Sequence, residues 1–570
     1  MGITAGKMTS IYDKLSEERK LLQEQGQLPE WFITPGWQLF KEKYLYEAKG
    51  LRDTYHRIAY TAAKHTNDVD YWHSAFFNIL WNGWLAPSTP VLSNMGTIKG
   101  APVSCSGGYV DDSIDGFYSA YHETAMLTKY GFGTSSYLGD IRPRGTKIRT
   151  GGKASGVLPI IKHFVQDMRD VAQGTSRRGA WAGYLPIDHA DFKETVDYLE
   201  HHPDDLNIGW IISDRFIDRL NMLDLDAQER YQRALKVKAV TGKGYFFFTD
   251  KVNRANPQCY KDKGLDVKAS NLCTEITLHS DVENTFTCVL SSMNLAKYDE
   301  WSNTDAVFTA TVFLDCVASE FIRVAKDVKG LERARRFTER SRALGLGTLG
   351  FHTYLQEHLI PFESFEAHMI NLEIFKLMKE QSDEATRWMA KEWGEPELLI
   401  GYGERNSHRL AIAPNTSSAL LAGGVSQGIE PLVSNLYNQA TSAGEILRIN
   451  PTLLRLAEEH GLTKDQVVDQ LIDSEGSVQH VTWLSDEEKL VFKTAYEIDQ
   501  RAILRLASAR QQYIDQAQSI NLFFDANEDE GYISEIHKEA FLDPDIKSLY
   551  YMRTKAGVQA SKNECIACEG

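Results

Sequence analysis

Short apolar runs punctuated by glycine alternate with helical stretches between about residues 86 and 295, and this alternation constrains the fold more than any other feature. It predicts an α/β fold, in which strands form a central sheet and helices cover it. A break rich in Pro, Ser and Thr, Ala86 to Pro90, follows a segment of helical spacing from Ser10 to about Trp84. Long amphipathic helices are predicted over roughly Thr304 to Leu344, Phe365 to Trp393, Asn450 to Asp473 and Asp486 to Ala517.

Composition limits the classes of partner. The chain has 570 residues, 42% of them hydrophobic and 25% charged, with a formal net charge of -16. No basic block indicates binding to nucleic acid or to a membrane surface. The start of the chain lacks an apolar signal core, and the most apolar stretch, Ala306 to Ala325, is interrupted by Asp315 and Glu320, which predicts a buried helix. Seven scattered cysteines are typical of a reducing compartment, so we expect a cytoplasmic protein.

The stretch Asn271 to Glu275 carries the strongest local signal of chemistry. If it is a short strand, Asn271, Cys273 and Glu275 share one face. An amide can hold a hydroxyl-bearing substrate, and a carboxylate can take a proton from it. A lone cysteine is more often a small buried hydrophobe, but Asn and Glu on the same buried face are costly unless they are paired or used. The local spacing therefore leaves a structural and a catalytic cysteine both open.

Other candidate sites are ambiguous when each is taken alone. Asn415, Thr416 and Ser417 stand at a predicted helix start, where hydroxyls and exposed amides could cradle a phosphate, although a plain helix cap explains them equally well. Tyr550 and Tyr551 lie in a strand-like run from Lys547 to Met552, a pattern that packed aromatics also produce. Two further thiols, Cys105 and Cys288, are equally compatible with inert packing.

Two motifs invite a wrong interpretation. Gly345 to Gly350 matches a dinucleotide-binding fingerprint but follows an Arg-rich helical run, Leu331 to Arg342, instead of a strand, so its context argues against a dinucleotide site. Cys565 and Cys568 have the spacing of half a zinc site, yet no second Cys or His pair lies nearby. On a small polar C-terminal tail they indicate a redox dithiol.

Taken in order, these motifs resemble the large catalytic subunit of class I ribonucleotide reductases. The resemblance runs from about Tyr44 to the end and also includes Ser88-Thr89-Pro90, the loop from Gln173 to Gly179, and Gly428-Ile429-Glu430-Pro431. It implies a ten-stranded α/β barrel with a central finger loop. The implied domains are a helical segment over 1–85 without an ATP-cone, the barrel over 86–554, and a flexible redox tail over 555–570.

The resemblance also implies residue roles. Cys273 becomes the thiyl radical that takes the ribose 3′-hydrogen, Glu275 is the base for the 3′-hydroxyl, and Asn271 bonds the sugar. Cys105 and Cys288 supply two electrons by forming a disulfide, although they are 288 − 105 = 183 positions apart. Cys565 and Cys568 then exchange with that disulfide. Tyr550 and Tyr551 relay the radical from a partner subunit.

Binding residues follow by the same resemblance. The implied substrate contacts are Thr89, Ser104, Gly131, Asn415, Thr416 and Ser417, with Asn415 standing where the family often has an acidic residue. The implied effector contacts, at a dimer interface, are Asp112, Ser113, Arg142, Ile148, Arg149 and Arg177. Without the resemblance, a solvated surface would explain these arginines.

The expected reaction is reduction of ribonucleoside diphosphates to deoxyribonucleoside diphosphates. The expected partners are a small radical-generating subunit with its own metal centre, thioredoxin or glutaredoxin, a second copy of the chain, and deoxynucleoside triphosphate or ATP effectors, with no metal or other cofactor bound in this chain. The alternatives are an adenosylcobalamin-dependent reductase, which the tyrosine pair disfavours, and a catalytically dead nucleotide-binding paralogue, which the intact cysteines and Glu275 disfavour.

Overall fold

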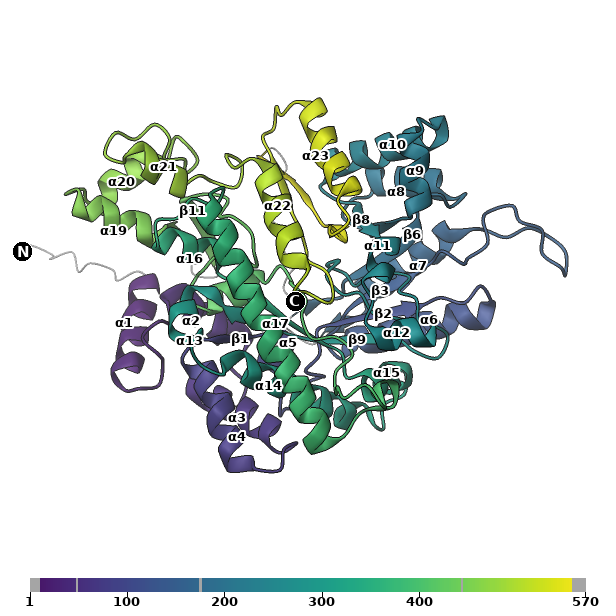
Figure 1. The fold of residues 1–570 in the computed structure, drawn as a ribbon, viewed down its shortest axis with the longest axis horizontal. Coiled ribbons are helices and arrows are strands. Elements are labelled where there is room, and N and C mark those ends of the chain that lie inside the picture. Colours follow the sequence, from purple (N-terminus) through teal and green to yellow (C-terminus); the bar gives the residue numbers. More distant parts are fainter. Residues whose placement is uncertain (1–10, 48–49, 174–176, 442–443, 556–570) are drawn as a thin grey trace, which may run out of the picture.

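Helices make up the N-terminal part of the chain. The computed structural model describes residues 11–47, 50–173, 177–441 and 444–555, leaving aside the side chains of 11, 172–178 and 437–447. The first helices are α1 (Ile11–Glu24), α2 (Thr34–Lys43), α3 (Leu51–Ala63) and α4 (Val69–Trp81). They lie together at one side of the molecule (Figure 1). Phe76 of α4 packs edge-on against Phe313 at 5.3 Å between ring centroids, so these helices share a hydrophobic core with the rest of the chain.

The first half of the main sheet is parallel. Its strands pair in the order β2 (Cys105–Tyr109), β3 (Gly133–Tyr137), β6 (Trp181–Pro186), β7 (Asn207–Ile212) and β8 (Tyr245–Phe248). The connecting helices are α6 (Ile114–Lys129), α7 (Val157–Asp170), α8 (Phe192–His201), α9 (Asp214–Asn221) and α10 (Leu225–Thr241). This is the strand–helix alternation that the sequence predicted, because parallel neighbours need a crossover between them.

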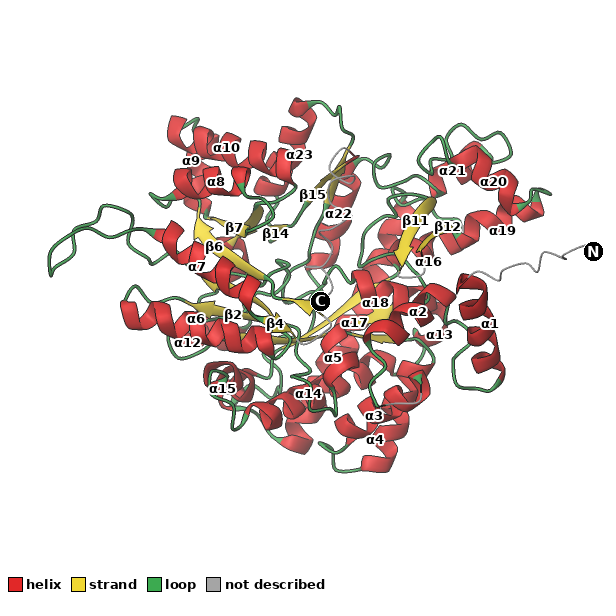
Figure 2. Cartoon of the chain, turned by 180° about the vertical axis from the view of Figure 1, so that it is seen from behind, coloured by secondary structure: helices red, strands yellow, loops and turns green. Residues whose placement is uncertain are grey.

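The second half closes the sheet into a barrel. It consists of β9 (Phe286–Asn294), β10 (Leu344–Leu349), segment 410–412, segment 516–524 with β13 (Leu522–Phe524), and segment 548–554 with β14 (Ser548–Leu549) and β15 (Met552–Thr554). These neighbours are parallel, whereas β9 pairs antiparallel with β2, and β14 antiparallel with β8. Five segments from each half give the predicted ten-stranded α/β barrel. Figure 2 shows the strands at the centre with helices around them.

Only one predicted long helix keeps its length: α17 (Phe365–Trp393) spans the predicted residues. The prediction of a single helix from Thr304 to Leu344 was wrong, because α14 (Ala306–Ala325) and α15 (Glu332–Ser341) are separated by a turn at Gly330, whose φ is +88°. The other two predicted helices are also divided, into α19 (Pro451–Glu459) with α20 (Lys464–Leu471), and α21 (Asp486–Val491) with α22 (Gln500–Gln511). Within the described ranges, no helix is long and apolar enough to cross a membrane.

The glycine-rich run Gly345 to Gly350 is explained by packing. Most of it forms β10, a fully buried strand. A Cβ on Gly345 would lie 2.7 Å from Cys288 Sγ, and one on Gly347 would lie 2.5 Å from the carbonyl oxygen of Ala411. Only glycine allows the strand to approach both neighbours this closely.

Shorter elements complete the chain. They are β1 (Leu85–Pro87), α5 (Thr89–Asn94), β4 (Ala172–Gln173), β5 (Arg177–Arg178), α11 (Thr249–Arg254), α12 (Gln258–Lys263), α13 (Tyr298–Trp301), α16 (Phe351–Glu357), α18 (Thr416–Leu421), β11 (Leu436–Thr441), β12 (Gly444–Ile449) and α23 (Glu530–Leu542), with short 3-10 turns at Leu295–Lys297 and Glu397–Leu399.

Candidate active site

The segment Asn271 to Glu275 is a turn within a long loop that connects α12 to β9. The prediction of a strand was wrong, because Thr274 has a left-handed backbone, with φ of +72°, and its N–H donates to the carbonyl of Asn271 at 3.4 Å. The turn nevertheless brings the predicted groups together. Asn271 Nδ2 donates to Glu275 Oε1 at 2.9 Å, and Cys273 lies between these two residues at the tip.

Side chains from around the barrel hold this loop by its carbonyl groups. The donors are Ser135 of β3 to Ser270 (2.7 Å), Tyr184 of β6 to Asn271 (2.6 Å), Ser519 to Cys273 (2.6 Å) and Ser548 of β14 to Thr274 (3.0 Å). Buried carbonyls need such partners, since no ladder hydrogen bond satisfies them here. Because the donors come from strands in both half-sheets, the loop lies inside the barrel, as the finger-loop prediction requires.

Glu275 is a buried carboxyl with a shifted acidity. It is 1% exposed and accepts hydrogen bonds from Asn271 and, at 3.1 Å, from Ser519 Oγ. Burial raises the pKa of Glu275 to about 7, although the two hydrogen bonds oppose the rise. A carboxyl with a pKa near neutrality is suited to exchange a proton with a bound hydroxyl.

Cys105 and Cys288 face one another across the antiparallel pair of β2 and β9. They are register partners, and the usual Cα separation of such partners, about 4.5–5.5 Å, falls within the range for a disulfide. Both are thiols in this structure. Asn271 Nδ2 donates to Cys105 Sγ at 3.3 Å, which places the pair beside the finger loop. Burial, with Cys105 as the next cause, raises the pKa of Cys288 well above its usual value.

Tyr550 and Tyr551 form a path of two adjoining, tilted rings to Cys273. The Tyr550 hydroxyl donates to Cys273 Sγ at 3.5 Å, and the two tyrosine rings are 4.1 Å apart between centroids. Tyr550 is fully buried, whereas Tyr551 is 7% exposed and so is the outer member. The backbone of Tyr551 is held by Asn521, which in turn donates to Glu430 at 2.6 Å. The predicted strand-like run is divided here, since the pair lies between β14 and β15.

Most of the predicted substrate residues lie near the starts of α5 and α18, whereas Gly131 lies near Asn94, at the end of α5. Ser104 Oγ donates to Ser88 Oγ at 3.1 Å, immediately before Thr89. Ser418, next to Ser417, donates to the carbonyl of Pro87 at 3.5 Å, so the two helix starts lie side by side. Thr89, Gly131 and Thr416 are half-buried, whereas Ser104 and Ser417 are buried.

Asn415 holds the turn before α18. Its φ is +63°, a conformation that Asn tolerates better than most residues. Its Nδ2 donates inward, to Ser292 Oγ at 2.8 Å and to the carbonyls of Thr348 and Ala413. This amide nitrogen therefore fixes the turn that presents Thr416 and Ser417.

The predicted effector residues fall into two groups. Arg142 Nε donates to Asp112 Oδ2 at 2.5 Å, and Ser113 caps α6 by accepting from the N–H of Gly116. Ile148 and Arg149 lie on a hairpin closed by pairing of Lys147 with Lys153. This hairpin belongs to the loop before α7, which projects far from the body (Figure 1).

Three predicted residues cannot be placed by their side chains. Arg177 begins β5, but its side chain is outside the described part of the structure. Cys565 and Cys568 fall in 556–570, also outside the described residues.

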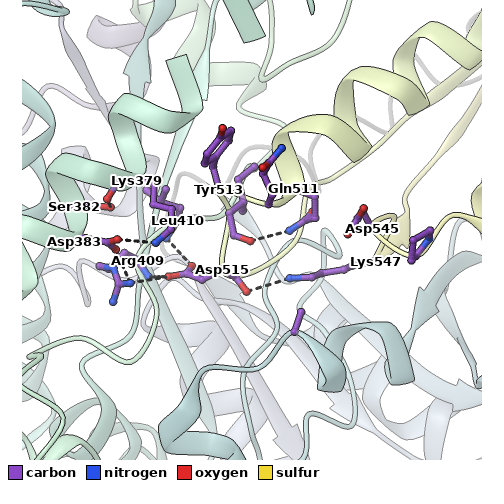
Figure 3. Close-up of a pocket in the computed structure, with 14 residues that line it drawn as sticks. Lys379, Ser382, Asp383, Arg409, Leu410, Gln511, Tyr513, Asp515, Asp545 and Lys547 are labelled. Atoms are coloured by element: carbon purple, nitrogen blue, oxygen red, sulfur yellow. Dashed lines mark hydrogen bonds and ion pairs between the residues drawn. The ribbon is translucent and has the colours of Figure 1, made fainter. Parts of the chain in front are cut away.

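A cavity of about 270 Å³ lies apart from the predicted site residues (Figure 3). The charged side chains that line this cavity bond to other residues of its wall. Arg409 donates to Asp383 at 2.8 Å, and the Asp515 carboxylate accepts hydrogen bonds from the backbone N–H groups of Arg409 and Leu410. Lys547 donates to the carbonyl of Gln516, whose side chain lies 3.8 Å from Cys288 Sγ. This cluster therefore braces the barrel wall behind the thiol pair.

Several residues in the site were missed by sequence reasoning. Ser519 contacts both Glu275 and the Cys273 carbonyl, Gln516 contacts Cys288, and Tyr184 holds Asn271. None of them stands next to a recognised motif, and Ser519 is 244 positions from Glu275. Single polar residues in apolar strands were the only available signal, and such residues are common in large barrels.

The fold and the site define a class of protein. It is an α/β barrel that encloses one thiol on an internal loop, with a separate pair of thiols beside that loop and two tyrosines that lead to the loop thiol. Two family models match the chain, "Ribonucleotide reductase, all-alpha domain" over residues 32–100 and "Ribonucleotide reductase, barrel domain" over 103–224, 219–398 and 397–552. The chain belongs to the ribonucleotide reductase large-subunit family.

Relatives and a solved structure agree with this assignment. A Frog virus 3 (isolate Goorha) protein that carries the name of a ribonucleoside-diphosphate reductase large subunit is 37% identical, over 86% of this chain and 91% of its own length. The ribonucleoside-diphosphate reductase large subunit of Invertebrate iridescent virus 3 is 30% identical, over 95% and 98%. The solved Actinobacillus ureae class Id ribonucleotide reductase alpha subunit superposes with a TM-score of 0.86 at 37% identity, over 94% of this chain and 98% of that one.

Proposed function

We propose that this chain is the catalytic large subunit of a class I ribonucleoside-diphosphate reductase, and that it reduces ribonucleoside diphosphates to 2′-deoxyribonucleoside diphosphates. The observation that carries this proposal is the contact of the Tyr550 hydroxyl with Cys273 Sγ, inside a barrel that also holds Glu275 and the Cys105–Cys288 pair. A thiol is a weak reductant of carbon but, once it has lost a hydrogen atom, its sulfur can take one from a ribose carbon.

The proposed reaction uses each group once. The Cys273 sulfur radical takes the 3′-hydrogen, and Glu275 accepts the proton of the 3′-hydroxyl while Asn271 holds the sugar. Cys105 protonates the departing 2′-hydroxyl, which leaves as water. Cys105 and Cys288 together give up two electrons and become a disulfide, while the hydrogen of the Cys288 thiol goes to the 2′-carbon. Glu275 returns its proton to the 3′-oxygen, and Cys273 returns its hydrogen to the 3′-carbon. Burial of every group keeps the radical from water and stray reductants.

The substrate is proposed to lie across the starts of α5 and α18. Thr89 and Ser104 would contact the nucleotide on one side, Thr416 and Ser417 would donate to the diphosphate, and Gly131 would border the bound nucleotide. The role of Asn415 is then to hold the phosphate turn. We also propose a helical domain over 1–85, a barrel domain over 86–554 and a redox tail over 555–570.

The test compares three mixtures of the purified chain with ribonucleoside diphosphate and dithiol: the chain alone, with adenosylcobalamin, and with a metal-loaded small radical-generating subunit. Turnover only in the third mixture is expected. Turnover in the second would replace the proposal with the cobalamin-dependent class, and none in any mixture, despite substrate binding, would favour an inactive paralogue.

Glu275 should give the enzyme a dependence on pH near neutrality. As a base, Glu275 must be ionised, so turnover should rise through about pH 7, and Glu275→Gln should abolish most of the turnover.

The same carboxyl should make stability depend on pH. Because the pKa of Glu275 in the native state lies above its pKa in the unfolded chain, the native state binds more protons between about pH 4.5 and 7. The free energy of unfolding should therefore fall by about 3 kcal/mol over this range in the wild type relative to Glu275→Gln. Glu229→Gln, which changes an exposed carboxyl, is the control. If the free energy of unfolding depends on pH in the same way in Glu275→Gln and in the wild type, the prediction is contradicted.

The terminal dithiol is proposed to regenerate the Cys105–Cys288 pair by exchange with thioredoxin or glutaredoxin. A variant with both Cys565→Ser and Cys568→Ser should lose turnover with the protein reductant by about a hundredfold or more. A small dithiol that reaches the internal disulfide directly should restore the same variant, which controls for folding. Normal cycling of the double variant with thioredoxin would remove the tail from the pathway.

Effector binding is proposed at a dimer interface that includes α6. Asp112, Ser113 and Arg142 lie at its start, and Ile114 and Tyr118, one turn apart on α6, are 69% and 63% exposed. Deoxynucleoside triphosphates should bind one class of site per chain, stabilise a dimer and alter which substrate base is preferred. Tyr118→Glu should weaken the dimer about tenfold or more in sedimentation, since it places charge in the interface; Tyr71→Glu, at an exposed position of α4, is the control. Two distinct dATP sites per chain by calorimetry would contradict the proposal.

A further inference from the structure

A third tyrosine lies against the proposed relay pair. Tyr245, the first residue of β8, is fully buried, and its hydroxyl donates to that of Tyr551 at 3.2 Å. Its ring is 4.8 Å from that of Tyr550 and 5.4 Å from that of Tyr551 between centroids. It therefore contacts both members of the pair from one side.

Strand register explains this placement. Antiparallel pairing of β14 with β8 sets Ser548 opposite Phe247 and Leu549 opposite Phe246. Continued by one residue, the same register sets Tyr550 opposite Tyr245. Directly opposed residues are the closest side-chain neighbours between two strands, so the backbone pairing itself brings the third ring against the relay.

A buried lysine side chain ties the two backbones together at this point. Lys238 of α10 is fully buried, and its Nζ donates to the carbonyl of Gly244 at 3.0 Å and to the carbonyl of Tyr550. Gly244 immediately precedes Tyr245. One side chain thus fixes the peptide beside the third tyrosine and the peptide between the two relay tyrosines.

The position of Tyr245 differs from that of a relay member. The rings of Tyr550 and Tyr551 already touch, and Tyr550 already reaches Cys273, so a hydrogen atom can pass along the pair without a third stop. Tyr245 lies beside this path and its hydroxyl points at the outer phenol oxygen. That oxygen keeps a lone pair in both the phenol and the phenoxyl state, so it can accept the Tyr245 hydrogen bond throughout.

We infer that Tyr245 is a positioning residue for radical transfer: its hydroxyl holds the Tyr551 phenol oxygen, and its ring keeps the two relay rings in contact. This inference rests on the proposed relay. The partner subunit's oxidant takes one electron and the phenolic proton from Tyr551, which becomes a phenoxyl; Tyr551 then takes a hydrogen atom from the Tyr550 hydroxyl, and Tyr550 takes one from the Cys273 thiol. Tyr245 keeps its own proton and electrons in every step.

The test changes one hydroxyl. Tyr245→Phe should lower kcat about tenfold, the order expected for loss of one hydrogen bond at the reacting group, while KM for the diphosphate stays within about twofold. Tyr231→Phe is the matched control, because it also removes a buried hydroxyl, one that donates to the carbonyl of Ser534 at 3.4 Å and does not touch the relay.

A spectroscopic readout separates positioning from a general loss of structure. With 3-aminotyrosine in place of Tyr551, the trapped radical should show coupling to an exchangeable hydrogen-bonded deuteron after exchange into D₂O. This coupling should be lost in Tyr245→Phe and kept in Tyr231→Phe. Wild-type turnover together with an unchanged coupling in Tyr245→Phe would overturn the inference.

Two further variants keep the outcomes distinct. Full turnover of Tyr551→Phe would defeat the relay itself, whereas an inactive Tyr551→Phe with a fully active Tyr245→Phe would defeat only the role of Tyr245. If Tyr245→Phe does not fold, 3,5-difluorotyrosine at position 245 tests the same point, since it keeps ring and hydroxyl. A rate within about twofold of wild type supports positioning; a new radical centred on the fluorinated ring would show that Tyr245 is oxidised, and the inference would be wrong.

Discussion

Replacing Cys273 with serine should abolish turnover, with a rate at least about a thousandfold below wild type, or about 4 kcal/mol of lost transition-state stabilisation. The reason is chemical: a hydroxyl O–H is much harder to cleave homolytically than a thiol S–H, so Tyr550 could not generate an oxygen radical at this position. The measurement is the rate of deoxyribonucleotide formation in the presence of the small subunit and excess dithiol.

Folding and binding of Cys273→Ser should be nearly normal. The substitution is close to isosteric, and the loop is held by its backbone carbonyls, which the side chain does not affect. Nucleotide binding by calorimetry should survive, and the free energy of unfolding should change by about 1 kcal/mol. Cys259→Ser is the control, because Cys259 is a buried thiol of the same hydrophobic cluster and lies on α12, outside the finger loop. Substantial reduction of substrate by Cys273→Ser would remove Cys273 from its proposed role.

Tyr550→Phe and Tyr551→Phe should each stop turnover, by about a thousandfold, without unfolding the chain. Each removes one hydroxyl and keeps the ring, so packing of the buried pair is retained. A phenol can lose a proton and an electron together, whereas a phenyl ring cannot at accessible potentials, so the path from the partner's oxidant to Cys273 would be cut.

The competing explanation, that the two rings only pack, predicts nearly neutral substitutions. Turnover and the free energy of unfolding should therefore be measured on the same preparations. Tyr298→Phe is a suitable control, since it removes a hydroxyl bonded to Glu373 at 2.9 Å, far along the chain from the relay. An active Tyr550→Phe would be the more damaging result, because its hydroxyl is the one that contacts Cys273 Sγ.

The sequence by itself determined the class of fold and named the groups that we propose to be reactive. Strand–helix alternation predicted an α/β fold, and the order of the Cys, Tyr and hydroxyl motifs along the chain produced the resemblance to ribonucleotide reductases that implied a barrel with an internal loop. The long helix α17 was predicted with its bounds, because its apolar spacing is uninterrupted from Phe365 to Trp393.

Only the tertiary structure decided how these groups meet. Asn271 and Glu275 approach through a turn with Thr274 in a left-handed conformation, which local alternation of side chains could not predict. Cys105 and Cys288 become neighbours because β2 and β9 join the two half-sheets, and the glycines at 345 and 347 are required by what packs on them. Ser519, Gln516 and Tyr245 enter the site from strands far away in sequence. Such contacts depend on register and closure of the barrel, which arise from long-range pairing and leave no local pattern in the chain.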